Sequence, residues 1–471
     1  MRLYNTLIRE IEDFTPLNNK KVSIYSCGPT VYDHIHIGNL ASFIYADTLS
    51  RTLRASGYEI DHVMNFTDVD DKTIKRSKEK YPNLDPKQAL KKLTTEYSKL
   101  FLDDMRSVGC DVESIKFINA TDRIEDMKAL ITKLHDDGFA YIADDGVYFS
   151  IKEYRDSGKK YGQLLDITDS NTSSARIQND EYDKDSPHDF ALWKIGKADE
   201  PIWDFTLDGK KLDGRPGWHI ECSAMSANTL GQPFDIHTGG VDLIFPHHEN
   251  EIAQSTAGKA NPTLANIFIH NEHLLVDGRK MSKSLNNFFT LQDIQDNDLD
   301  PLAFRLMVLQ SHYRSQSNFT WTNLEAAQNR IKDIRAMADL VFQTRTKGES
   351  GLVEGDFLKH LESIKKAIED DINLPEVLKQ VSDLTADMLH FTIEEDQLSY
   401  FKNLLDYIDQ ILGLDLTNRS NISDAQKLTL SERQKARDNK NWVKSDQLRD
   451  RLAGEGIGVR DTKQGQVWFR I

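Results

Sequence analysis

The chain has 471 residues, of which 39% are hydrophobic and 28% charged, and its formal net charge is −16 at pH 7. At roughly 100–200 residues per domain, this length predicts about three domains. The chain lacks an apolar run of the ~18 residues needed to cross a bilayer, and its first residues lack the apolar core of a signal peptide, so we expect a cytoplasmic protein with no membrane partner.

The cysteine content and the distribution of charge indicate the cellular compartment and the kind of binding partner. Three cysteines, Cys27, Cys110 and Cys222, make no disulfide framework and fit a reducing compartment. A net negative charge argues against a nucleic-acid partner when taken alone. From Ser431 to the end, however, 10 Lys or Arg face 6 Asp or Glu, a net of +4, which leaves −20 for the rest. We expect this tail to be the only strongly basic stretch; charge alone fits a phosphate-binding face or a solvated helix face.

The first elements predict a nucleotide-binding α/β domain. Val22 to Ser26 is typical of a short buried strand, and Glu59 to Phe66 of a second one. Between them lies a helix with Asn39 as its expected N-cap and Gly57 as its stop. Its apolar residues recur every three or four positions: Leu40, Phe43, Ala46, Leu49 and Leu53. Such a strand–loop–helix–strand unit begins many doubly wound folds.

The loop from Cys27 to Asn39 has features of a phosphate and nucleotide site. A helix N-terminus offers free N–H groups and a partial positive charge, which favour phosphate. Gly38 has no side chain, so a base or ribose can pack against the backbone there. The acidic loop Asp68–Asp71 follows the second strand; contact with substrate and capping of the helix near Lys72 both stay open.

The middle of the chain is less regular. Asp122 to Gly138 predicts an amphipathic helix, and Gly146 to Ser150 a strand. Asp166 to Ser186 is rich in Asp, Asn, Ser and Thr, so we expect it to be mobile. Order should resume at Asp189–Lys194.

Helical periodicity dominates the last third. The expected segments are a helix at Asn323–Thr344, a helix at Phe357–Asp370, a break at Asp371–Pro375, a linker at Arg419–Asp424, a last helix at Ser431–Leu452 and a strand pair at Gly456–Ile471.

Metal-binding side chains gather after residue 214. His247 and Glu251 are four residues apart, so on a helix that starts after Pro246 they share one face. His248 is a competing ligand, but helix geometry turns it about a quarter-turn away, which suggests a supporting role. The chain lacks a Cys-x-x-Cys pair, so spacing by itself is a weak metal signal.

Several long motifs, in order, resemble one enzyme family. His36-Ile37-Gly38 and Lys280-Met281-Ser282-Lys283-Ser284 resemble the paired signatures of class I aminoacyl-tRNA synthetases. Cys27, Asn65–Asp71, Gly217–Cys222 and Pro246–Glu251 resemble the cysteinyl-tRNA synthetases in particular.

The resemblance implies an α/β fold with a Rossmann-like parallel-sheet catalytic domain. This domain would comprise residues 1–110 and 214–290, split by a connective insert at 111–213. A stem-contact segment at 291–322 and a helical bundle at 323–420 would follow, and a small anticodon-binding module would fill 421–471.

The resemblance also implies an activity and its residues. The family activates L-cysteine with ATP and Mg²⁺ and transfers it to the 3′-terminal adenosine of the cysteine tRNA; we expect a monomer. One Zn²⁺ would be held by Cys27, Cys222, His247 and Glu251 and would select the substrate thiol. The catalytic residues would be His36, Lys280 and Lys283; the nucleotide would contact Thr30, Gly38, Asn39 and Lys283; and the cysteine pocket would contain Thr67, Trp218 and His237.

Two departures and three alternatives accompany this resemblance. Asn39 stands where the family usually has a second His, and Asn286 where it usually has Gly. One alternative is the related ligase that joins cysteine to an amino sugar in mycothiol synthesis, which lacks a full anticodon-binding end. Others are a non-catalytic zinc- and nucleotide-binding protein, and a closed zinc site that only holds the insert.

Overall fold

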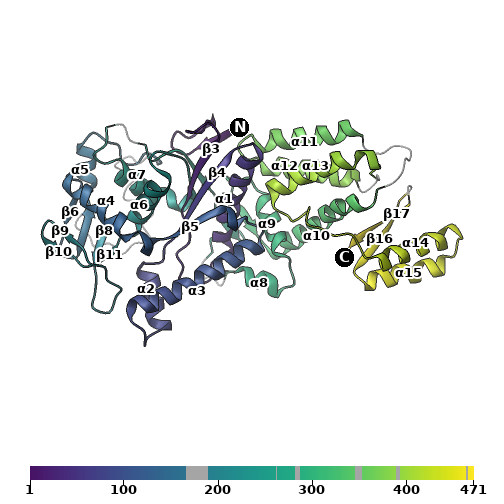
Figure 1. Ribbon diagram of the computed structural model, residues 1–471, viewed down its shortest axis with the longest axis horizontal. Helices are drawn as coiled ribbons and strands as arrows, with labels where there is room; N and C mark the ends of the chain where they lie inside the picture. Colours follow the sequence, from purple (N-terminus) through teal and green to yellow (C-terminus); the bar gives the residue numbers. More distant parts are fainter. Residues whose placement is uncertain (166–188, 261–262, 282–286, 345–352, 389–392, 463–464) are drawn as a thin grey trace. The chain divides into compact units, whose positions relative to one another are not determined.

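A parallel sheet organises the first half of the chain (Figure 1). In the computed structural model, the described residues form a five-stranded sheet in the order β13-β12-β3-β4-β5. Its strands are β3 (Lys21–Ser26), β4 (Glu59–Phe66), β5 (Ile115–Asn119), β12 (Phe234–Gly240) and β13 (Ala265–Asn271). Within this sheet, the central strand β3 comes first in the sequence. The strands β4 and β5 follow on one side of it, and β12 and β13 are added on the other side. This reversal makes the carboxyl ends of β3 and β12 a topological switch point, where α/β sheets bind ligands.

The structure describes residues 1–165, 189–260, 263–281, 287–344, 353–388, 393–462 and 465–471. Two compact units divide them. The first contains Met1–Leu275, Lys280–Leu291 and Tyr313–Gln316, and the second contains Val276–Arg279, Gln292–His312 and Ser317–Ile471. The expected mobile stretch at 166–186 lies outside the described residues. Within the described residues, no helix is long and apolar enough to span a bilayer.

Helix α1 (Ile37–Ala55) connects β3 to β4 and begins three residues before the expected position. His36, not Asn39, is the N-cap: its Nδ1 accepts from the backbone N–H of Asn39 at 3.2 Å. The predicted stop is confirmed. Gly57 adopts φ +92°, and the N–H groups of Gly57 and Tyr58 donate to the carbonyls of Arg54 and Leu53. This pair of bonds is a Schellman motif, which needs a residue that tolerates positive φ.

A helical hairpin and the insert follow β4. The hairpin is α2 (Asp71–Lys80) and α3 (Pro86–Ser107). After β5, α4 (Ile124–Asp136) leads into a four-stranded antiparallel sheet in the order β11-β8-β7-β6. Its strands are β6 (Ala140–Ile142), β7 (Gly146–Phe149), β8 (Phe190–Ile195) and β11 (Gly214–Pro216), accompanied by α5 (Ile151–Asp156), β9 (Thr206–Leu207) and β10 (Lys210–Lys211).

The expected edges of the insert, residues 111 and 213, do not coincide with the edges of the two sheets. β5 pairs in parallel with β4, so the parallel sheet continues to Asn119. At the other end, Gly214 to Pro216 still pairs with β8 of the antiparallel sheet. After the antiparallel sheet, the chain returns to the parallel sheet through α6 (Trp218–Leu230). Helix α7 (Glu249–Thr256) then follows β12. Sequence composition could not mark either edge, because both are ordinary strands.

The N-terminal hairpin consists of β1 (Arg2–Asn5) and β2 (Glu10–Asp13). Hydrogen bonds join its end to the outer edge of β13. The side-chain amide of Asn5 donates to the carbonyl of Asn266 and accepts from the N–H of Phe268, each at 3.0 Å. The N–H of Thr6 donates to the carbonyl of Phe268 at 2.8 Å. Two residues thus satisfy polar backbone groups along an edge strand.

The second unit is mainly helical. Its helices include α9 (Pro301–Leu309), α10 (Trp321–Ala338), α11 (Glu354–Ile368), α12 (Leu374–Met388) and α13 (Leu398–Leu412); α8 (Leu291–Asp296), β14 (Leu274–Val276) and β15 (Ser317–Phe319) lie around the boundary between the units. The expected break at Asp371–Pro375 is confirmed, since Asp371 and Ile372 have φ of +56° and +53°.

The C-terminal part differs from the expected single helix at Ser431–Leu452. It contains two helices, α14 (Asp424–Asp438) and α15 (Trp442–Gly454), followed by the expected strand pair β16 (Ile457–Thr462) and β17 (Gly465–Arg470). The helices separate at Lys440, which has φ +56°. The basic residues between Ser431 and Leu452 are therefore divided between two helices. Arg433 is also buried and forms a bidentate pair with Asp461 at 2.8 and 2.9 Å.

Candidate active site

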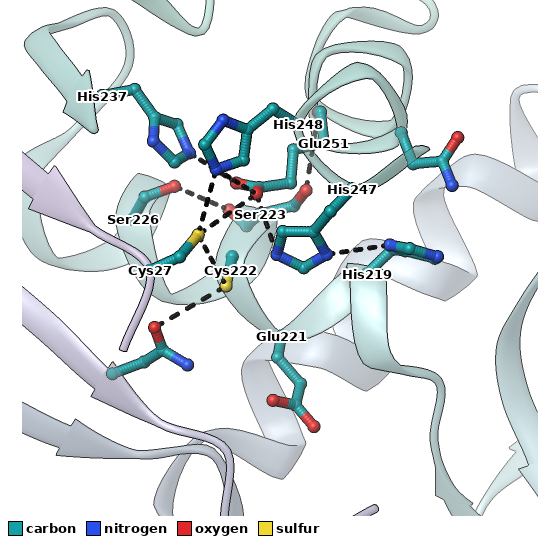
Figure 2. A network of polar contacts seen from close by, with 12 residues as sticks. Cys27, His219, Glu221, Cys222, Ser223, Ser226, His237, His247, His248 and Glu251 are labelled. Atoms are coloured by element: carbon teal, nitrogen blue, oxygen red, sulfur yellow. Dashed lines mark hydrogen bonds and ion pairs between the residues drawn. The ribbon is translucent and has the colours of Figure 1, made fainter. Parts of the chain in front are cut away.

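Four candidate metal ligands converge at the switch point of the parallel sheet (Figure 2). Cys27 follows β3, Cys222 lies on α6, and Glu251 on α7 with His247 just before that helix. Their ligand atoms all lie within 4.8 Å of one another. The structure thus brings together the four residues that the sequence proposed, from three separate segments of the chain.

The spacing of these atoms suits a tetrahedral ion. The two Sγ atoms lie 3.7 Å apart, Cys27 Sγ lies 3.6 Å from Glu251 Oε1, and His247 Nε2 lies 3.1 Å from the same oxygen. Ligands at Zn–S of ~2.3 Å and Zn–N or Zn–O of ~2.0–2.2 Å in a tetrahedron would be about 3.8, 3.6 and 3.4 Å apart in the same order. The donor set and its spacing therefore fit zinc.

His248 lies closer to this cluster than the sequence predicted. Its Nε2 is 3.3 Å from Cys27 Sγ, and Cys27, His237, His248 and Glu251 form a second group with metal-binding spacing. The expected quarter-turn offset fails because the chain before α7 is not a regular helix. Phe245 has φ −139° and ψ 132°, so His247 and His248 enter from an irregular turn.

Burial keeps the imidazoles of this region neutral. It lowers the pKa of His247 and His248 well below the usual value, and that of His219 and His270 to about 3. Each ring therefore donates from one nitrogen and accepts at the other. His247 Nδ1 lies 2.9 Å from His219 Nδ1, and the Trp218 ring stacks on His247 with centroids 4.3 Å apart.

The other imidazoles are anchored in the same way. His248 Nδ1 contacts His270 Nε2 at 2.8 Å, and His270 Nδ1 contacts Thr6 Oγ1 at 2.8 Å. His237 Nε2 contacts Glu251 Oε2 at 2.9 Å. Such outer contacts fix ring orientation around metal ligands in proteins.

The two thiols need a cation to ionise. Burial raises the pKa of Cys27 well above its usual value and also raises that of Cys222. A bound divalent ion reverses this tendency, because a coordinating thiol is deprotonated. The cluster is thus compatible with a metal site.

A buried polar network lies beside the thiols. Asn65 Oδ1 accepts from the N–H of Gly28 at 2.8 Å, and its Nδ2 lies 3.2 Å from Thr67 Oγ1. Thr67 in turn donates to Glu221 Oε2 at 2.8 Å. Burial raises the pKa of Glu221 well above its usual value, which favours the protonated form of this carboxyl group. Thr67 and Trp218 thus lie beside the cluster.

The phosphate-binding candidates surround the start of α1. His36 Nδ1 accepts from the backbone N–H of Asn39, which assigns the ring proton to Nε2. The ring meets Phe288 edge-on at 5.1 Å. At Gly38 an added Cβ would lie 2.2 Å from Cε of Met281, so the Met281 side chain approaches the loop closely. Thr30 pairs with Thr67 through a parallel bridge, and Asn39 is exposed.

Lys280 Nζ lies 3.2 Å from His273 Nε2. Lys283, together with Asn286, lies outside the described residues.

The three carboxylates of the acidic loop after β4 contact neighbouring segments of the fold. Asp70 caps α2 by accepting from the N–H of Thr73 at 2.7 Å, and Asp68 accepts from the N–H of Thr121 at 2.8 Å. Asp71 pairs with Lys194 and Arg215 of the insert. The capping alternative is confirmed, and these carboxylates hold neighbouring segments together.

Sequence reasoning missed Asn65, His219, Glu221 and His270. Asn65, His219 and Glu221 lie inside quoted motifs, which was the available signal. Their roles depend on which side chains the fold places opposite them, and His270 lies on β13 outside every motif.

Comparison with known proteins agrees with this geometry. Residues 13–329 match the model of the class I (C) tRNA synthetase catalytic domain, and residues 422–468 match the cysteinyl-tRNA ligase anticodon binding domain. A cysteine–tRNA ligase of Brachyspira hyodysenteriae is 40% identical, covering 99% of this chain and 98% of that protein. One from Leptospira interrogans is 39% identical, covering 99% of both.

Solved structures share the fold at low identity. A Mycobacterium tuberculosis methionyl-tRNA synthetase aligns with a TM-score of 0.56 and 14% identity, covering 87% of this chain and 94% of that one. A LeuRS–tRNA complex from Agrobacterium radiobacter K84 aligns with a TM-score of 0.60 and 10% identity, covering 86% and 85%. Taken with the full-length relatives and both matched domains, these findings establish that the chain belongs to the cysteine–tRNA ligase family of class I aminoacyl-tRNA synthetases.

Proposed function

We propose that this protein charges the cysteine tRNA with L-cysteine in two steps. The cysteine carboxylate attacks the α-phosphorus of ATP, and pyrophosphate leaves. A hydroxyl of the tRNA's terminal adenosine then attacks the carbonyl carbon of the adenylate, and AMP leaves. The observation that carries this proposal is a cluster of two thiols, an imidazole and a carboxylate next to the loop that bears His36. The reaction places the protein in the cytoplasm, where we expect it to act as a monomer.

The metal is the proposed basis of selectivity. Zinc held by Cys27, Cys222, His247 and Glu251 would bind the substrate as a thiolate and accept serine poorly. A size sieve could not do this, since near-isosteres differ by only about 1–3 kcal/mol in such pockets. We favour this set over the one with His237 and His248 because it includes both soft thiols.

Side chains of the protein donate hydrogen bonds and positive charge to the phosphates of ATP. His36 donates from Nε2 to an ATP phosphate oxygen, and Lys280 and Lys283 neutralise the leaving pyrophosphate, with Mg²⁺ accompanying ATP. Gly38, Asn39 and Thr30 contact the nucleotide. Thr67, Trp218 and His237 line the amino-acid pocket. Catalysis requires positioning and stabilisation of phosphate charge, without a covalent enzyme intermediate.

The amino-sugar ligase of mycothiol synthesis is the nearest alternative. The match of residues 422–468 to an anticodon binding domain speaks against it, because that enzyme has no anticodon to read. The non-catalytic alternative is disfavoured because the sequence retains His36, Lys280 and Lys283.

The experiment is cysteine-dependent ATP–pyrophosphate exchange, followed by charging of purified tRNA. We expect both activities. Exchange without charging of any tRNA would favour the amino-sugar ligase, and absence of exchange in the zinc-loaded full chain would contradict the proposal.

Metal content separates the two donor sets. Cys222→Ala should lose most of the zinc, whereas His248→Ala should keep most of it. The reverse result would move the ion to the second set.

A further inference from the structure

A second basic region lies on the helical hairpin α2–α3. The segment from Lys72 to Lys99 contains nine Lys or Arg and three Asp or Glu, which gives it a net charge of +6. This exceeds the +4 of the C-terminal tail, so the expectation that the tail is the only strongly basic stretch is wrong. In a chain of net charge −16, such a region stands out as a candidate for an anionic partner.

The charges gather on one face of the hairpin. On α2, Lys72, Arg76 and Lys80 follow one another at intervals of four residues, and on α3, Lys92 and Lys99 are seven apart, so each set shares a side of its helix. We call these five residues the hairpin basic face.

Ring contacts bring the two helices' charges together. Lys80 and Lys92 both lie over the Tyr81 ring, with Nζ 5.8 and 4.5 Å from its centroid. Lys80 also lies 4.9 Å from the centroid of Tyr97 on α3.

Few carboxylates neutralise this face. In the described part of the chain, Lys80 pairs with Glu96 at 2.7 Å and Arg76 with Glu79 at 3.7 Å. Lys72, Lys92 and Lys99 are exposed and form no ion pair with any described residue. These three ammonium groups are therefore available to an anion from solution.

The face begins at the active-site loop. Lys72 Nζ lies 5.7 Å from the centroid of Tyr32, and His34 meets Tyr97 edge-on with centroids 5.7 Å apart. Tyr32 and His34 belong to the same loop as His36. An anionic chain lying on the hairpin basic face would therefore lead to the site of reaction.

We infer that the hairpin basic face binds backbone phosphates of the tRNA near its 3′ end. The inference rests on the proposed function, which requires the tRNA end to reach the loop that bears His36. A polyanion that passes this loop meets Lys72, Arg76 and Lys80 in succession. Such contacts supply affinity and register without reading bases, because phosphates carry no sequence information.

The test uses Lys92→Gln/Lys99→Gln in the full chain. Both side chains are exposed and belong to the part of the face far from the loop in sequence. Binding of fluorescent cysteine tRNA is measured from 50 to 200 mM NaCl. Each lost phosphate contact lowers the slope of log K against log salt by about 1, so the double variant should lose about 2 and the single Lys99→Gln about 1. Exchange without tRNA should be unchanged.

A matched control removes equal charge elsewhere. Lys359→Gln/Lys402→Gln takes two exposed lysines from α11 and α13, which form no ion pair with a described residue. Its slope should match the parent. An unchanged slope in both hairpin variants, or an equal loss in the control, overturns the inference while exchange leaves the proposed function intact. Absence of exchange in the parent overturns the proposed function and this inference with it.

Discussion

The two nitrogens of the His36 ring have different proposed roles. Nδ1 caps α1, and the proposed function assigns to Nε2 a hydrogen bond to phosphate. We predict that His36→Asn keeps the stability of the parent, because Asn is a good N-cap, whereas His36→Ala loses about 1 kcal/mol. Both should lower exchange by roughly 10²–10³, the usual loss for a preorganised donor. Thermal melting and exchange measure the two effects; full exchange in His36→Asn would contradict the phosphate role.

The buried His62 should make the free energy of unfolding fall at acidic pH. It is buried on β4 between Ser26 Oγ at 2.7 Å and Ser50 Oγ at 2.9 Å, and burial lowers its pKa to about 4. The unfolded chain binds a proton near pH 6.5, so this stability is present above pH 6.5 and is lost as the pH falls toward 4. At pH 5 the loss should be about 2 kcal/mol relative to pH 7.5.

The matched variant for this prediction is His62→Gln, which cannot titrate. It starts less stable at pH 7.5, but its urea-unfolding free energy should fall about 2 kcal/mol less than the parent's on going to pH 5. Equal pH slopes in parent and variant would show that another group controls acid unfolding.

At the scale of elements, the loop after β3 passes close to β4 beside Cys27, the first candidate metal ligand. A Cβ at Gly28 would lie 1.7 Å from the backbone oxygen of Asn65, which cannot move away as a flexible side chain could. We predict that Gly28→Ala costs about 1–3 kcal/mol of stability and lowers zinc content, since Cys27 is its neighbour. Gly355→Ala is the control, because no atom lies within 4 Å of that Cβ. Normal zinc content and stability in Gly28→Ala would contradict this account.

The elements also show what could be predicted from sequence. Gly57 was placed correctly because positive φ at a helix end leaves a residue-type signal. His36 was missed as the cap because His is not among the preferred N-cap residues. The break at Lys440 was missed because neither glycine nor proline marks it.

The site followed the same rule. The four proposed ligands could be named in advance because the motifs that contain them resemble those of cysteinyl-tRNA synthetases; residue type and spacing alone gave a weak metal signal. His248 could not be placed, since its direction depends on an irregular turn at Phe245 that spacing does not encode.

At the scale of the whole molecule, Trp442 offers a cleaner test of tRNA reading than removal of the C-terminal part. A chain ending at Arg419 would lose Arg470, which pairs with buried Asp339, and the two bonds between Gln343 and the backbone of Trp468. Its failure would mix folding with recognition. Trp468 is itself buried, so of these two tryptophans Trp442 is the candidate for stacking on a base.

Trp442 is 54% exposed, with the Arg437 guanidinium 5.6 Å from its ring centroid. We predict that Trp442→Ala weakens tRNA binding by about 1–3 kcal/mol, the range for base stacking, and leaves exchange unchanged. Val443→Ala, at a neighbouring position 71% exposed, is the control. Equal tRNA affinity in Trp442→Ala and the parent would exclude stacking at this residue.

The contact of Asn5 and Thr6 with β13 has a consequence for handling the protein. Along that strand the Asn5 amide takes the place of a neighbouring peptide group, which shields an edge that would otherwise pair with another molecule. A protein lacking residues 1–6 should therefore self-associate on storage, through sheet edges rather than through unfolding. Light scattering over days, at a concentration where the full chain remains monodisperse, would reveal this; a deletion form that stayed monodisperse would show that the edge is protected by other means.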